Sequence, residues 1–123
     1  MEEDEVAIRK VVQTYLDGLY EGDADKLASV FHPTSTLTSE EGGELKPLPR
    51  DEWLAAVRAR PSPRSRELAR HDAILQVDRS SPTTAWVKLQ CAIPPRFFTD
   101  YLCFLKTGGR WQVAQKVFAT EMR

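Results

Sequence analysis

Hydrophobic residues in the first third of the chain recur every three or four positions, the spacing that places side chains on one face of a helix. Between residues 6 and 20 they form one wide stripe: Ile8, Val11, Val12, Tyr15, Leu16, Leu19 and Tyr20. Gly22 favours a left-handed helix end, and Asp23 favours the N-cap of a second helix. Because Pro33 disfavours helical backbone at the residue before it, we expect the second helix to end at His32.

Beyond this point the pattern becomes mostly the alternation of strands with one face on a core. Thr34–Thr38 and Leu45–Leu48 are predicted to be short strands joined across Gly42-Gly43, and a third helix is predicted to begin at Asp51 and end before Pro61. Four further strands are predicted over residues 68–77, 83–93, 97–106 and 110–119. This order predicts an α+β fold in which three helices cover one face of a mostly antiparallel sheet, as one domain over residues 1–123.

Composition excludes several classes of function. The 17 Lys and Arg residues nearly balance the 18 Asp and Glu residues, so no net positive field favours nucleic acid or an anionic membrane. The acidic N-terminus and the absence of a long apolar run predict a cytoplasmic protein. Cys91 and Cys103 lack metal-site spacing and are interpreted as reduced thiols, and no phosphate-loop, zinc or Ser-His-Asp motif is present. We therefore expect neither metal nor cofactor.

Several short motifs in this order resemble the nuclear transport factor 2-like superfamily, the cystatin-like α+β fold shared with ketosteroid isomerases and SnoaL-like cyclases. They are Tyr15-Leu16-Asp17-Gly18 with Gly22-Asp23, Phe31-His32-Pro33, Trp53 in the third helix, and Gly109-Arg110-Trp111-Gln112-Val113. The chain is most similar to the bacterial group described as "putative lumazine-binding", through Glu52-Trp53-Leu54, Arg60-Pro61-Ser62-Pro63, Thr99-Asp100-Tyr101-Leu102, and Trp111 with Lys116-Val117-Phe118. The resemblance implies a cone-shaped fold with a cavity at its open end. It is less specific for activity, because one fold hosts many functions.

The register of the last hairpin decides which polar residues face such a cavity. With Gly108-Gly109 as a two-residue loop, paired residue numbers sum to 217: Phe104 with Val113, Leu102 with Gln115, and Asp100 with Val117. If the more apolar face of the last strand is the inner one, Asp100 and Gln115 lie inside, whereas a one-residue bulge reverses this for one strand. A carboxyl group in an apolar cavity has a raised pKa and suits a general base or a neutral donor. The alternative is that Asp100 forms an ion pair with Lys116 or Arg96.

His32 is the second candidate, because the fold brings this position close to the cavity mouth and histidine titrates near neutral pH. The alternative is that His32 only terminates a helix. The expected pocket wall, which is equally compatible with plain core packing, comprises Tyr15, Leu19, Phe31, Trp53, Cys91, Leu102, Phe104, Val113, Gln115 and Val117. The arginine-rich segment 58–70 is interpreted as a solvated loop that could also contact an anionic ligand.

Three functions remain open. The first is a domain that binds a small apolar or aromatic ligand in the cone. The second is a cofactor-independent isomerase, cyclase or dehydratase with Asp100 or His32 as general base. The third is a protein-interaction module with a vestigial pocket. Trp86, Tyr101 and Cys103 are expected on the outer sheet face, where a homodimer is the simplest cover for an apolar stripe.

Overall fold

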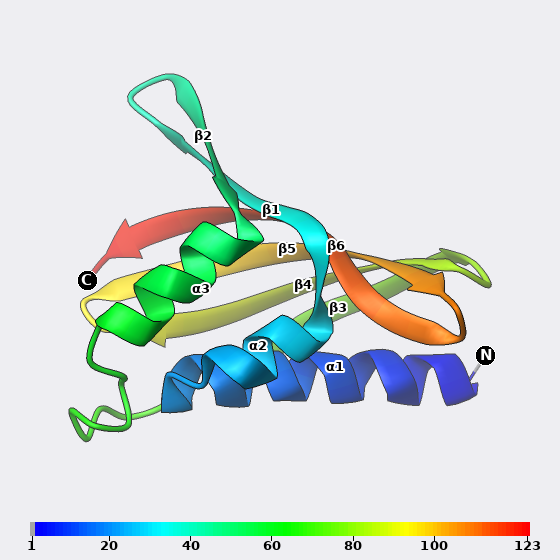
Figure 1. Ribbon diagram of the computed structural model, residues 1–123, viewed down its shortest axis with the longest axis horizontal. Coiled ribbons are helices and arrows are strands. Elements are labelled where there is room, and N and C mark those ends of the chain that lie inside the picture. Colours follow the sequence, from blue (N-terminus) through cyan, green and yellow to red (C-terminus); the bar gives the residue numbers. More distant parts are fainter. Residues whose placement is uncertain (1) are drawn as a thin grey trace.

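The computed structural model describes residues 2–123 and has three helices and a six-stranded sheet (Figure 1). The elements are α1 (Glu2–Glu21), α2 (Ala24–Val30), β1 (Phe31–Glu41), β2 (Glu44–Pro49), α3 (Arg50–Ala59), β3 (Ala73–Ser81), β4 (Thr84–Ile93), β5 (Arg96–Thr107) and β6 (Arg110–Met122). This confirms the predicted order and the α+β class. No helix within residues 2–123 is long and apolar enough to cross a membrane.

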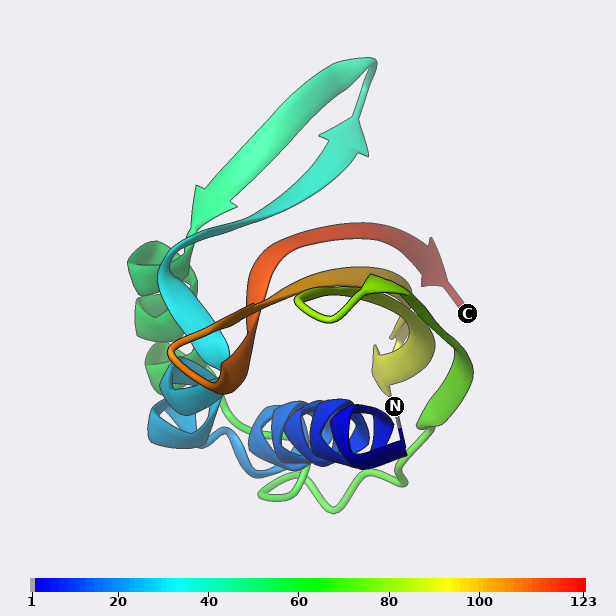
Figure 2. The ribbon, with the colours of Figure 1, turned by 90° about the vertical axis from the view of Figure 1, so that its right-hand side faces the viewer.

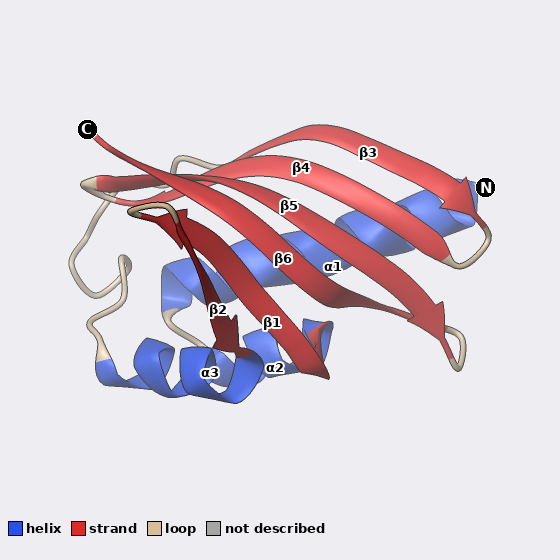
Figure 3. Ribbon diagram, turned by 90° about the horizontal axis from the view of Figure 1, so that it is seen from above, coloured by secondary structure: helices blue, strands red, loops and turns tan. Residues whose placement is uncertain are grey.

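The sheet has the order β2-β1-β6-β5-β4-β3, and its neighbours are antiparallel except for β1 and β6, which are parallel. Figure 2 looks along α1 and shows the sheet curving around this helix. Figure 3 shows α1 crossing one face of the strands, with α2 and α3 at the β1 side. The sheet therefore has an inner face against α1 and an outer face on the opposite side.

Several predicted element boundaries are wrong. The strand β1 covers Phe31–Glu41 rather than Thr34–Thr38, and β6 ends at Met122 rather than at residue 119. The helix α3 begins at Arg50, with Pro49 rather than Asp51 at its N-cap. The helix α2 ends at Val30 rather than His32, because Phe31 takes extended backbone and its side chain is fully buried in the core. The strand β3 begins at Ala73 rather than Leu68. Residues 68–72 lie outside the sheet, where the Leu68 carbonyl accepts a hydrogen bond from the Tyr20 hydroxyl at 2.8 Å.

The predicted register of the last hairpin holds only near its turn. Phe104 pairs with Val113 as expected, but a bulge then shifts the pairing by one residue, so that Leu102 faces Lys116 and Asp100 faces Phe118. The extra residue is Ala114, which lies between paired Val113 and Gln115. A bulge of this kind moves every following side chain of one strand to the other face.

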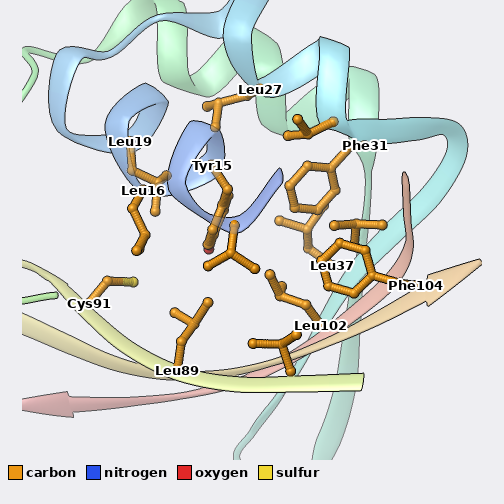
Figure 4. Packing of buried hydrophobic residues seen from close by; sticks show 14 of the residues in the cluster. Tyr15, Leu16, Leu19, Leu27, Phe31, Leu37, Leu89, Cys91, Leu102 and Phe104 are labelled. Atoms are coloured by element: carbon orange, nitrogen blue, oxygen red, sulfur yellow. The ribbon is translucent and has the colours of Figure 1, made fainter. Parts of the chain in front are cut away.

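The core lies between the inner sheet face and the helices (Figure 4). In this view Tyr15, Leu16 and Leu19 point from α1 toward the sheet, which contributes Leu89, Cys91, Leu102 and Phe104, while Leu27 and Phe31 close one side. Burying each of the large apolar side chains contributes about 1.5–3 kcal/mol. The alternation in β4 and the stripe on α1 therefore position one side chain from this helix, Tyr15, directly against the sheet.

Candidate functional site

Three polar side chains meet inside this apolar core: Tyr15 from α1, Asp100 from β5 and Lys116 from β6. Tyr15 and Asp100 are 0% exposed and Lys116 is 6% exposed. The Tyr15 hydroxyl donates a hydrogen bond to Asp100 Oδ2, and Lys116 Nζ donates one to the Tyr15 oxygen at 2.8 Å. Lys116 Nζ also lies 3.5 Å from Asp100 Oδ2. We call these residues the buried triad.

The bulge in β6 is what brings Lys116 into the triad. The first residues of β6 alternate Trp111 and Val113 inward, which without a bulge would continue with Gln115. The extra residue at Ala114 instead turns Lys116 inward, opposite Leu102 and beside Asp100. The alternative interpretation of Asp100, an ion pair with Lys116, is thus confirmed.

Aromatic rings surround the Lys116 ammonium group. Its nitrogen lies 5.3 Å from the ring centroid of Tyr15, 5.6 Å from that of Trp53 and 4.7 Å from that of Phe118. Trp53 is itself held by Phe31, with ring centroids 4.9 Å apart. The faces of aromatic rings attract cations, and this attraction strengthens where water is excluded. The aromatic rings around Lys116 therefore stabilise its buried ammonium group.

The two oxygens of Asp100 have different surroundings. Oδ2 accepts from the Tyr15 hydroxyl, is next to Lys116, and is 3.6 Å from the Cys91 sulfur, which donates to it. Within residues 2–123 no hydrogen-bond donor reaches Oδ1. A carboxylate oxygen has lone pairs that a buried site normally satisfies. Asp100 therefore has one oxygen, Oδ2, that its neighbours hold in place, and one buried oxygen, Oδ1, that has no donor and can accept a proton.

The neighbours of Asp100 keep their own protons. Burial, followed by the negative charge of Asp100, raises the pKa of Tyr15 well above its usual value. The same two causes raise the pKa of the Cys91 thiol. At neutral pH both groups are consequently donors to Asp100 rather than bases.

A cavity of about 650 Å³ lies at the end of the sheet where β4 and β5 meet and where β6 ends. Cys91 and Phe98 line it from the face that carries Asp100, and Cys91 touches both the cavity and Asp100. Gln90, Phe97, Thr99, Ala119 and Glu121 line it from the opposite, outer face of the sheet, and the remaining lining residues are Arg70, His71, Asp72, Ala73, Thr120 and Arg123. The lining is thus more polar than the apolar pocket that the sequence predicted.

The residues of the predicted pocket wall fall into two groups. Tyr15, Leu19, Phe31, Trp53, Cys91, Leu102, Phe104 and Val113 are buried in the core, and Cys91 also lines the cavity. Gln115 and Val117 were predicted to face inward and instead face outward, because the bulge reverses them; Val117 is 52% exposed. Gln115 accepts a hydrogen bond from Thr36 on the neighbouring strand.

His32 lies apart from Asp100. Its ring nitrogen Nδ1 accepts a hydrogen bond from the backbone N–H of Thr34 at 3.1 Å and lies 2.8 Å from the Thr34 hydroxyl. These contacts hold the His32 side chain against its own strand, β1, and the structure does not bring it together with the triad.

Sequence reasoning missed two parts of this site. Lys116 was considered only as a partner for Asp100, although a single cation in the apolar run from Val113 to Phe118 was a visible signal. His71 is exposed but lines the cavity, with its ring 5.2 Å from that of Phe97. No sequence pattern indicated that contact.

Comparison with known proteins shows which proteins this chain resembles. A crystal structure of an NTF-2 like protein of unknown function from Silicibacter pomeroyi shares 23% identity, covers 98% of both chains and superposes with a TM-score of 0.85. A ketosteroid isomerase-like protein from Erwinia carotovora atroseptica shares 15% identity over the whole of both chains, with a TM-score of 0.76. At these identities the likeness concerns the fold.

Among curated proteins, an aldolase, FrzH, from a Cladobotryum species is 26% identical over 114 residues, which is 91% of this chain and 87% of that protein. The family model described as "Putative lumazine-binding" matches residues 3–119. The chain therefore belongs to this family and has the fold of NTF-2 like proteins.

Proposed function

We propose that this domain is a cofactor-independent acid–base enzyme that removes a proton from the carbon next to a carbonyl group of a small substrate. The observation that carries the proposal is a completely buried carboxylate, paired with a buried ammonium ion, that leaves one oxygen without a donor. Buried ion pairs contribute little net stability compared with apolar side chains of similar shape. Buried charges close to a cavity are instead typical of catalytic sites.

Each member of the triad has a distinct role in this reaction. Asp100 Oδ1 takes the proton from the α-carbon, and the electron pair of the broken C–H bond moves to the carbonyl oxygen to form an enolate. The Lys116 ammonium group, with N–H donors beyond the one it gives to Tyr15, stabilises that oxyanion. Tyr15 is a positioning residue because its hydroxyl holds Asp100 Oδ2. The enolate then either takes the proton back at carbon or attacks an aldehyde carbon. In the second case the π bond of the aldehyde carbonyl breaks, and the resulting alkoxide takes the proton from Asp100.

The aldolase FrzH supports this reaction class, since aldol addition begins with the same proton removal. The position of the cavity supports it as well. Cys91 is in contact with Asp100 and lines the cavity, so a molecule bound there is one side chain away from the base. Asp100 is 0% exposed and does not line the cavity, so in this proposal Cys91 or Phe98 moves aside to admit the substrate.

Deuterium exchange tests the proposal without knowledge of the natural substrate. The protein is incubated in D2O with a panel of simple ketones and aldehydes, and loss of the α-proton signal is followed by proton NMR. We expect Asp100→Asn, which is isosteric, to slow exchange by about 10²–10⁴-fold, the usual contribution of a general base. Asp25→Asn, at a side chain that is 96% exposed, is the matched control. A folded Asp100→Asn protein that exchanges as fast as wild type would exclude Asp100 as the base.

A second function, ligand binding without turnover, is favoured by the cavity lining. Phe97 contacts the His71 ring edge and lies under the Arg123 guanidinium at 4.7 Å, while Gln90 and Thr99 add hydrogen-bonding groups. Such a lining suits a flat heteroaromatic ligand, and the family's description makes lumazine the probe of choice. Lumazine binding that is equal in wild type and Asp100→Asn, with no exchange activity in either, would favour this function.

We also propose a homodimer through the outer sheet face. Trp86 and Tyr101 form a ring pair there with centroids 5.9 Å apart, and exposed Leu105 and Val117 extend the apolar surface. A sheet face of this kind normally needs cover from another layer.

A further inference from the structure

Lys116 is the only buried lysine within residues 2–123; the other lysines there are exposed or half-buried. A lysine attacks a carbonyl carbon only as the neutral amine, and lysines that act as nucleophiles in proteins lie in desolvated, apolar sites. The surroundings of Lys116 therefore raise the question of whether its nitrogen is a nucleophile as well as a counter-ion for Asp100.

Two hydrogen bonds connect the Lys116 ammonium group to the Asp100 carboxylate through Tyr15. Nζ donates to the Tyr15 oxygen at 2.8 Å, and the Tyr15 hydroxyl donates to Asp100 Oδ2. One proton passed along this chain leaves Lys116 as a neutral amine and Asp100 as a neutral acid, while Tyr15 remains a phenol. Because isolated charges are costly in an apolar core, losing both charges of the pair together is the least costly way to free the amine.

The rings around Lys116 suit the product of an attack by this amine on a carbonyl group. The product, an iminium, carries the same single positive charge on Nζ. The rings of Tyr15, Trp53 and Phe118 therefore keep a cation 4.7 to 5.6 Å from their centroids, and Asp100 keeps its counter-ion. The site thus stabilises the covalent state with the same contacts that hold the free lysine.

A chain of ring contacts leads from the cavity to Lys116. Phe98 lines the cavity, its ring centroid lies 6.1 Å from that of Phe118, and the Phe118 ring centroid lies 4.7 Å from Nζ. Both phenylalanines are half-buried. Because partly exposed side chains change rotamer readily, a small carbonyl compound in the cavity reaches Nζ when these two rings turn aside.

We propose that Lys116 forms an iminium with an aldehyde or ketone, after giving a proton to Asp100 through Tyr15. The Nζ lone pair forms a bond to the carbonyl carbon, the carbonyl π bond breaks, and the oxygen takes a proton from the nitrogen to give a carbinolamine. The carbinolamine C–O bond then breaks: the hydroxyl takes the proton from Asp100 and leaves as water, while the nitrogen lone pair forms the C=N bond. One water is released, and the charge pair is restored.

The inference rests on the proposed function and deepens it by changing where the electron pair goes. When Asp100 Oδ1 takes the α-proton of the iminium, the electron pair of the C–H bond forms a C=C bond, and the π pair of the C=N bond moves to nitrogen. The positive nitrogen accepts this pair without a new negative charge, so the iminium replaces the oxyanion of the noncovalent reaction. The substrate class is thereby an aldehyde or ketone rather than an ester, which an amine would acylate.

Reductive trapping tests the inference on the wild-type protein. Propanal is added with sodium cyanoborohydride, which reduces an iminium to a stable secondary amine, and peptide mapping by mass spectrometry locates the propyl group over time. We expect Lys116 to be modified before any other lysine, although exposure alone favours the surface lysines. Lys106 is the internal control, because it contacts Asp4 directly at 3.1 Å and lies 6.0 Å from the Trp111 ring, but its side chain is 33% exposed.

A pair of tyrosine variants tests the proton chain. Tyr15→Phe keeps the ring but removes the hydroxyl between Lys116 and Asp100, and it should slow trapping at Lys116 by about 10²-fold or more, the usual contribution of a positioned proton-transfer group. Tyr20→Phe removes a hydroxyl from the same helix that donates to the Leu68 carbonyl, and it should leave trapping unchanged. The inference is overturned if Lys106 is modified before Lys116 in the wild type, or if folded Tyr15→Phe is trapped as fast as Tyr20→Phe.

The two proposals fail differently. If ketones exchange their α-protons in an Asp100-dependent way but Lys116 is not trapped, the acid–base function stands with an oxyanion, and the iminium is excluded. If Lys116 is trapped ahead of the other lysines but no carbonyl compound exchanges its α-protons, the iminium stands and the acid–base function fails.

Discussion

Removal of the buried ammonium group should destabilise the protein more than any surface change. Lys116→Met keeps the length of the side chain and removes its charge, so Asp100, which is 0% exposed, loses its cation. At a separation of 3.5 Å and an effective dielectric constant of about 20, the lost attraction is roughly 5 kcal/mol. Measurements on broken buried pairs give a similar loss of about 3–5 kcal/mol. This is a large part of the roughly 5–15 kcal/mol that stabilises a typical domain.

The informative variant replaces the whole triad with apolar residues. Tyr15→Phe, Asp100→Val and Lys116→Met together remove the charge pair and the hydroxyl that bridges it, so that little is left buried without a partner. Replacing a complete buried ion pair by apolar residues of similar volume is often neutral or stabilising. We therefore expect the triple variant to lie within about 2 kcal/mol of the wild type, although Lys116→Met alone loses more, and to have no exchange activity.

Urea unfolding at pH 7, followed by tryptophan fluorescence and far-ultraviolet circular dichroism, measures both effects. Changes in the midpoint at a constant slope report stability. Lys46→Met is the control, because Lys46 forms a surface pair in which the two side chains are 49% and 75% exposed, and it should cost no more than about 1 kcal/mol. If the triple variant loses as much stability as its single changes added together, the triad is a structural element, and the proposed function loses the observation that carries it.

Three further predictions concern the scaffold. In urea unfolding, Gly22→Ala should lower the free energy of unfolding by more than about 1 kcal/mol, and by more than Gly43→Ala does. Both glycines have positive φ, but only a Cβ at Gly22 meets a neighbour, Ser62 Cβ at 2.7 Å. Equal losses of stability would mean that only backbone strain matters. A hydrogen bond from Trp111 is the largest of the causes that lower the pKa of Asp4 in the folded protein below its usual 3.8. The stability that Asp4 contributes is therefore complete above the pKa of Asp4 in the unfolded chain, and it is lost as pH falls through the pKa in the folded protein. Acid unfolding of Asp4→Asn should therefore be less steep below pH 4, and an unchanged acid limb would contradict this. Sedimentation velocity at micromolar concentration should give a dimer, and a monomer would remove the proposal for the outer sheet face.

The sequence predicted the order of the elements because periodicity records which side chains are buried. The stripe on α1 placed Tyr15 toward the sheet, and the alternation in β4 placed Cys91 inward; both are buried. The start of β3 was predicted wrongly because residues 68–72 are partly apolar, yet they lie outside the sheet, where the Leu68 carbonyl accepts a hydrogen bond from Tyr20 near the end of α1. A tertiary hydrogen bond of this kind leaves no local pattern in the sequence.

The register of β5 and β6 shows why the site was harder to predict than the fold. The Gly108-Gly109 turn determines the pairing as far as Phe104 with Val113, and counting from the turn works to that point. The bulge at Ala114 follows without a glycine or a residue of positive φ, so no residue type announces it. Turn chemistry therefore specifies only the near end of the hairpin.

Electrostatics supplies the constraint that turn chemistry lacks. In either register Asp100 faces the core, because β5 keeps its alternation, and a buried carboxylate needs a cation or several donors. Without the bulge its inward neighbour on β6 would be Gln115, which offers only a neutral amide; with the bulge it is Lys116, which offers a charge. The bulge leaves one residue out of the ladder, a smaller loss than an unpaired buried carboxylate. The requirement of Asp100 for a cation thus favours the observed register, and a single inserted residue determines whether the core contains an amide or a charge pair suited to proton transfer.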